Sequence, residues 1–164
     1  MTLEHLIAFS IALFAAIASP GPALLVDIQT TLSSGRTAGI AIGCGLGLMA
    51  AMWTMLALLG LEAIFQVAPW AYAAARIVGA LYLLYIAWGL WQGARRKVES
   101  ALKPARRAFR QGVLINMTNP KSVLFAAAVL IVIFPAEMTL FENAAVVLNH
   151  LVIEVLFYTA LAVG

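Results

Sequence analysis

The chain has 164 residues, of which 64% are hydrophobic and only 10% are charged. An ordinary soluble domain carries roughly one quarter charged residues, and so short a chain would leave much of its surface in water. The composition excludes a soluble globule and predicts an all-α integral membrane protein, with residues 1–164 forming a single transmembrane domain.

The formal net charge of +3 comes from a local cluster and does not indicate a nucleic-acid partner. Such a cluster is typical of a cytoplasmic loop beside anionic membrane lipids. The sequence has one cysteine, Cys44, so no intrachain disulfide forms and no zinc-type spacing exists. No cofactor is expected. Seven of the ten Lys and Arg residues make up the cluster: Arg95, Arg96, Lys97, Lys103, Arg106, Arg107 and Arg110.

A membrane-spanning helix needs about 20 apolar residues, and about five stretches meet or approach that length. The links between them alternate between basic and acidic. Because cytoplasmic loops carry the excess of Lys and Arg, Arg36 and the basic loop 93–110 are expected inside and the N-terminus outside. The predicted spans are 3–32, 38–61, 67–91, 112–134 and 144–164.

The first stretch is interrupted by Pro20-Gly21-Pro22. Each proline lacks an N–H and clashes with the preceding helical turn, so the stretch is predicted to form two half-helices. The second would begin near Ala23 with unpaired N–H groups at its positive end, which suits a carboxylate. A kink that serves packing alone is the alternative.

The second stretch carries glycines at every fourth position. Gly35, Gly39, Gly43 and Gly47 share one helical face and would let another helix approach closely. This pattern predicts helix packing and says little about a substrate.

The fourth stretch contains a second break, at Pro120. Asn116, Asn119 and Lys121 surround it, and polar groups at this depth are costly unless they are paired or hydrated. Two interpretations remain open for Lys121: it extends to the cytoplasmic interface, or it belongs to a functional site.

Two carboxylates fall within predicted spans. Asp27 lies after the first break, and Glu154 lies in the fifth span with Tyr158 one turn further on the same face. A carboxylate in the membrane usually binds a proton, a cation or a basic side chain, and Asp27 with Lys121 is one candidate pair. His150 shares a face with Glu154, but the whole chain has only two histidines, so no closed set of metal ligands is expected and no metal is predicted.

These motifs, in their order and spacing, resemble the LysE/RhtB family of amino-acid exporters along the whole chain. Two positions depart from the family pattern: Ala23, where an Asn is frequent, and Met49-Ala50, where Gly-Asp is frequent. The resemblance rests on Pro20-Gly21-Pro22, Gly35-Arg36, Gly39, Gly79, Tyr82, Leu83, Tyr85, the basic loop, Asn116 and Asn119-Pro120-Lys121.

The resemblance implies a six-helix fold of two inverted three-helix repeats, with helices 1 and 4 broken at proline. This chain would contain about five of those helices. The implied function is a secondary transporter, not an enzyme, that exports an amino acid or a related small metabolite across the bacterial cytoplasmic membrane by proton antiport. Its partners would be this substrate, protons and membrane lipids, and homo-oligomer formation is left open.

Within this hypothesis, the start of the second half-helix and the amides of Asn116 and Asn119 hold the carboxylate and amine of the substrate. Asp27 or Glu154 carries the proton. The competing interpretation is a truncated or non-transporting helical membrane protein. A further apolar span beyond Gly164 would favour the exporter.

Overall fold

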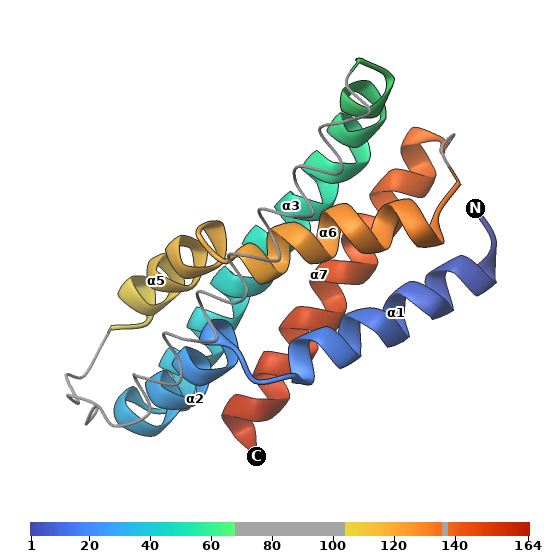
Figure 1. The fold of residues 1–164 in the computed structure, drawn as a ribbon. Coiled ribbons are helices and arrows are strands. Elements are labelled where there is room, and N and C mark those ends of the chain that lie inside the picture. The colour runs from blue at the N-terminus through green and yellow to red at the C-terminus, as the bar shows by residue number, and fades with distance from the viewer. Residues whose placement is uncertain (68–103, 136–137) are drawn as a thin grey trace.

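The computed structural model describes residues 1–67, 104–135 and 138–164. These residues form helices and no strands, so the all-α prediction is confirmed (Figure 1). The predicted span 67–91 and most of the loop 93–110 lie outside the described residues. The helices are α1 (Leu3–Ala18), α2 (Pro22–Ser34), α3 (Arg36–Val67), α5 (Ala105–Met117), α6 (Pro120–Ile133) and α7 (Leu140–Val163).

The first predicted span is broken as expected. Helix α1 ends at Ala18, α2 begins at Pro22, and the two helices are bent by 60° relative to each other. Pro22 occupies the first helical position, where its fixed φ angle suits the helix and its missing N–H would have no partner. Gly21 is the N-cap, with extended backbone.

The second break has the same construction. Helix α5 ends at Met117, and Pro120 is the first residue of α6. Asn119 is the N-cap, and its side-chain oxygen accepts a hydrogen bond from the backbone N–H of Lys121 at 3.1 Å. Both helices predicted to be broken at proline are therefore broken there.

The start of α5 differs from the prediction. The basic loop was expected to continue to Arg110, but the helix already begins at Ala105, directly after Pro104. Ala, Arg and Gln are good helix formers, and one face of this segment packs inward through Ala108 and Gly112. The arginines on the other face remain exposed. A helix therefore buries the small residues on one face and leaves the arginines in solvent on the other.

Helix α3 is the central element. It packs against α5 and α7 and also contacts α2 and α6 (Figure 1). Among the described residues, Arg36–Gly60 and Leu140–Val163 are long and apolar enough to cross a membrane, and the bent pair of α1 and α2 could form a third crossing. Large apolar side chains that face outward, such as Ile11, Leu59 and Leu156, suit contact with lipid.

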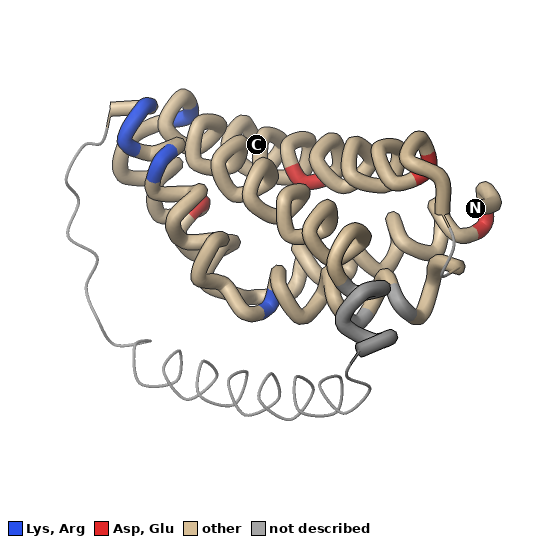
Figure 2. The backbone as a smooth tube through the Cα atoms, turned by 90° about the horizontal axis from the view of Figure 1, so that it is seen from above, with Lys and Arg blue, Asp and Glu red and all other residues tan. Residues whose placement is uncertain are grey.

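Most of the Lys and Arg residues gather at one end of the molecule, where α3 and α5 begin (Figure 2). Acidic residues lie at the other end, near the N-terminus, and also within the bundle (Figure 2). At that acidic end the ammonium of Met1 forms an ion pair with Glu142 in the first turn of α7. The N-terminus and the start of α7 are therefore on the same side of the bundle.

Candidate functional site

A pocket of about 30 Å³ lies where the break between α1 and α2 meets α6 and α7. A volume of this size holds about one or two water molecules. The lining combines apolar walls with a few polar groups. Its residues are Leu13, Ala16, Ile17, Ser19, Gly21, Ala23, Leu24, Asn119, Lys121, Ser122, Phe125, His150, Glu154 and Tyr158.

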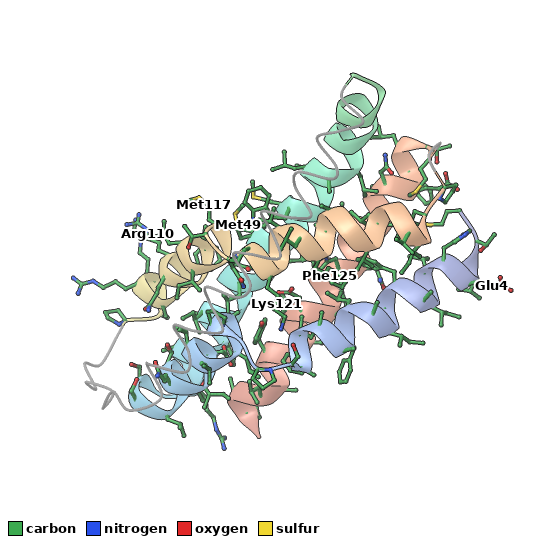
Figure 3. The ribbon with its side chains drawn as sticks, in the orientation of Figure 1. Glu4, Met49, Arg110, Met117, Lys121 and Phe125 are labelled. Atoms are coloured by element: carbon green, nitrogen blue, oxygen red, sulfur yellow. The ribbon has the colours of Figure 1, made fainter. Side chains whose placement is uncertain are left out.

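Lys121 reaches from the start of α6 to the break between α1 and α2 (Figure 3). Its Nζ donates to the carbonyl oxygen of Ser19 at 3.0 Å and to the hydroxyl oxygen of Ser19 at 2.5 Å. The same Nζ would lie 3.6 Å from a Cβ placed on Gly21. The suggested pair with Asp27 is therefore wrong, and Lys121 faces the pocket.

Glu154 and His150 form a buried pair on α7 in the lining of the same pocket. Nε2 of His150 lies 3.1 Å from Oε1 of Glu154, and Nδ1 lies 2.6 Å from Oγ1 of Thr54. The second carboxylate oxygen of Glu154 is buried without a hydrogen-bond partner among the described residues. Glu154 is close enough to Lys121 for their charges to interact.

Asp27 lies outside the pocket. Its side chain is fully buried, and neither carboxylate oxygen has a hydrogen-bond partner in the described part of the chain. Oδ1 would lie 3.4 Å from a Cβ on Gly43, so Asp27 faces α3. Tyr158 lines the pocket, and its Cβ would also contact a Cβ on Gly43.

The two predicted amides have different places. Asn119 lines the pocket, whereas Asn116 does not. The Nδ2 of Asn116 donates to the carbonyl of Leu46 at 2.6 Å, and its Oδ1 accepts from Nδ2 of Asn119 at 3.3 Å and from the hydroxyl of Ser122. Its backbone carbonyl accepts from Nε1 of Trp53 at 3.1 Å. Asn116 thus fastens the second break to α3 instead of facing a substrate.

Two helix N-termini point at the pocket. Gly21, Ala23 and Leu24 at the start of α2 line it, as do Asn119 and Lys121 at the start of α6. No side chain caps the start of α2, so its first N–H groups remain available to an anion. Pro20, Pro22 and Pro120 make the breaks without lining the pocket themselves.

The glycines of α3 allow α7, which carries Glu154 and Tyr158, to pack closely against α3. A Cβ on Gly43 would lie 2.5 Å from Cβ of Tyr158, and one on Gly47 would lie 3.2 Å from Cβ of Glu154. Gly39 meets Ala162 in the same way, at 3.0 Å. Three of the four glycines thus let α7 approach α3 closely.

Gly35 differs from the packing prediction. A Cβ there would meet nothing within 4 Å, and the residue instead ends α2 with a φ of 85°, a conformation that favours glycine. From the sequence alone, His150 is considered only as a metal ligand, and Thr54 is not singled out. The spacing of four residues between His150 and Glu154 was the available signal, but Thr54 had none.

Comparison with known proteins gives consistent matches. Residues 14–164 match the model of the LysE type translocator family. The uncharacterized membrane protein YahN of Escherichia coli K12 is 33% identical over 139 residues, which cover 81% of this chain and 62% of that relative. No solved structure matches the chain significantly.

Other relatives are named for transport. The threonine efflux protein of Escherichia coli K12 is 32% identical over 124 residues, covering 70% of this chain and 59% of the relative. The protein of the same name from Salmonella typhi is 31% identical over 123 residues, with the same coverage. The chain therefore spans about 60% of the length of these relatives. Together with the apolar helices, the matches make this chain a multi-pass membrane protein.

Proposed function

The chain belongs to the LysE type translocator family, and on that premise we propose that it exports an amino acid or a related small metabolite by proton antiport. The membrane would be the bacterial cytoplasmic membrane. The observation that carries this proposal is the pocket between the two broken helices, because it brings a lysine, a carboxylate and two helix N-termini together. Transporters typically bind their substrates where discontinuous helices meet.

The name of the threonine efflux relatives supports a small amino acid as the substrate. The carboxylate of this substrate binds at the start of α2, where the N–H groups of Ala23 and Leu24 are free of side-chain caps. Asn119 contributes its remaining amide N–H. Asn116 is left out of the binding set because its polar atoms are engaged within the protein.

The proton is carried by Asp27 or Glu154. Each has at least one buried carboxylate oxygen without a partner among the described residues, and such an oxygen gains from binding a proton. The two differ in position, since Glu154 lines the pocket and Asp27 does not.

The orientation follows from the charges. The N-terminus and the start of α7 face outside, and Arg36 and the segment 93–110 face inside. The ion pair between Met1 and Glu142 supports a common side for the first two. The matched breaks before Pro22 and Pro120 support the inverted relation between two helix sets.

The test is efflux from proteoliposomes that contain the purified protein and labelled threonine, driven by an imposed pH gradient. We expect efflux to depend on the gradient, and we expect Asp27→Asn or Glu154→Gln to uncouple it. Glu4→Gln is the matched control, because Glu4 is exposed on the first turn of α1. Absence of efflux for every standard amino acid, or unchanged coupling in both variants, would contradict the proposal and favour a non-transporting membrane protein.

A further inference from the structure

We propose that the pocket recognises the two charges of an amino-acid zwitterion with two different side chains: Lys121 binds the carboxylate, and Glu154 binds the ammonium. This inference rests on the proposed function and deepens it. It assigns each of the two charges of the proposed amino-acid substrate to one side chain.

The separation of the two charges is the first argument. Lys121 and Glu154 line the same pocket and interact electrostatically, yet they do not form an ion pair with each other. Lys121 bonds to Ser19 on one side, and Glu154 bonds to His150 on the other. The pocket lining therefore contains both signs of charge, each held by a different neighbour, and such a lining complements a small dipolar ion.

The ammonium group of Lys121 has one N–H donor that is available to a ligand. An ammonium group has three N–H donors, and the two contacts with Ser19 leave one for a ligand. The uncapped start of α2 lies next to it, with Ala23 and Leu24 in the lining. A carboxylate at this end would therefore accept from Lys121 and from backbone N–H groups, both favourable for an anion.

The glutamate side has an acceptor without a donor. Oε1 of Glu154 is engaged by His150, whereas Oε2 is buried with no partner among the described groups. A buried acceptor of this kind is costly until a donor reaches it. The ammonium of a substrate would supply that donor together with the opposite charge.

Thr54 and His150 act as positioning residues for this carboxylate. The ring of His150 is held by Thr54 at one nitrogen and Glu154 at the other, and it packs against Phe9 and Phe125 with ring centroids 5.7 and 6.1 Å away. The side chain of Glu154 is thereby fixed with one oxygen engaged and the other free.

The assignment also separates substrate from proton. Because Glu154 takes the ammonium, the proton falls to Asp27, which is fully buried outside the pocket. Tyr158 lines the pocket and, like Asp27, lies against Gly43 of α3.

The experiment measures exchange of labelled threonine across proteoliposomes without a pH gradient. Threoninamide, which lacks the carboxylate, and N-acetylthreonine, which lacks the ammonium, serve as competitors. If another standard amino acid exchanges faster than threonine, that amino acid is used as the labelled substrate, and its own amide and N-acetyl derivative are used as the competitors. Each derivative should compete at least about tenfold less well than the parent, since one charged hydrogen bond is worth about 1.5 to 3 kcal/mol.

The variants assign each charge to its side chain. Glu154→Gln should weaken binding of the parent amino acid and reduce only the discrimination against the N-acetyl derivative. Lys121→Gln should reduce only the discrimination against the amide. His150→Gln should reduce the discrimination against the N-acetyl derivative in the same way as Glu154→Gln but to a smaller extent. General destabilisation of the protein would not change the discrimination against one derivative only. Glu4→Gln should leave both ratios unchanged.

Two failures are distinguishable. If no amino acid exchanges, the proposed function itself fails. If exchange occurs and the wild-type protein binds either derivative as well as the parent, the zwitterion assignment is overturned while the exporter remains. The comparison of competitors on the wild-type protein decides this even if a variant does not fold. The assignment would also be contradicted if Glu154→Gln reduced the discrimination against the amide and Lys121→Gln reduced that against the N-acetyl derivative.

Discussion

The buried side-chain amide of Asn116 forms its hydrogen bonds with neighbouring groups of the protein. Its side chain is 1% exposed and joins α3, the second break and the start of α6 through Leu46, Asn119 and Ser122. Removing the Asn116 amide would leave the carbonyl of Leu46 without its side-chain donor. We therefore propose that Asn116 stabilises the site and does not bind the substrate.

We expect Asn116→Ala to lower the free energy of unfolding by about 1 to 3 kcal/mol, the cost of unsatisfied buried polar groups. For a chain of this size that corresponds to a loss of roughly 2 to 4 °C in melting temperature per kcal/mol. The measurement is the melting temperature in detergent by size-exclusion chromatography. Thr118→Ala, at an exposed neighbouring position, is the control, and a changed substrate KM with unchanged stability would contradict the structural role.

The closest helix crossing depends on two glycines. A Cβ on Gly45 would lie 2.2 Å from the backbone carbonyl oxygen of Phe109, and one on Gly112 would lie 2.3 Å from that of Ile42. Backbone atoms cannot yield as a flexible side chain does. Neither glycine can be replaced without separating α3 from α5.

Gly45→Ala should therefore destabilise the protein by about 1 to 3 kcal/mol, the usual cost of overpacking. Gly60→Ala, on the same helix, is the matched control, because no described atom lies within 4 Å of its added Cβ and alanine favours helix. Both are compared by thermal unfolding in detergent. Equal melting temperatures for the two variants would show that the crossing is looser than described.

At the scale of the elements, the two breaks define the site. Both use a proline at the first helical position after a short interruption, which exposes a fresh helix N-terminus within the bundle. A continuous first helix would carry its positive end away from the pocket.

Replacing both Pro20 and Pro22 with Ala should let α1 and α2 join. We expect threonine efflux to fall by more than about tenfold, because the substrate loses a charge-assisted contact worth about 1.5 to 3 kcal/mol. Pro135→Ala is the control, because this proline is exposed and lies outside the pocket lining. Normal efflux by the double variant, with circular dichroism confirming that it is folded, would contradict a role for the break.

The breaks were predictable from sequence because proline acts locally. The partners of the polar residues were not, because they come from helices far apart in the chain. The link from Lys121 to Ser19 spans 102 residues, and that from Thr54 to His150 spans 96. The extension of α5 to Ala105 was missed because exposed arginines suggest a loop until their inward-facing neighbours are known.

At the scale of the whole molecule, the charges predict how the bundle sits in the membrane. The N-terminus and the start of α7 share one end through the ion pair of Met1 and Glu142. The arginines of α3 and α5 lie at the other end (Figure 2). From the positive-inside rule we propose that the arginine end faces the cytoplasm.

Single cysteines test this orientation after Cys44 has been replaced by serine. Thr2→Cys and Thr37→Cys form a matched pair, since both threonines are exposed and lie at opposite ends. In intact cells, a membrane-impermeant thiol reagent should label the cysteine at position 2 and spare that at position 37. The reverse labelling would invert the proposed topology.

The most direct test of the central claim is protection of the pocket by its substrate. Ala16 lines the pocket on α1, and its side chain makes no polar contact that a cysteine would disturb. In the Cys44→Ser protein, reconstituted in proteoliposomes, a small thiol reagent should modify Ala16→Cys more slowly when the transported amino acid is present. Labelling of Thr118→Cys, which is exposed outside the pocket, should not change. If saturating amino acid leaves the labelling of Ala16→Cys unaltered while efflux continues, transport does not pass through the pocket between the broken helices.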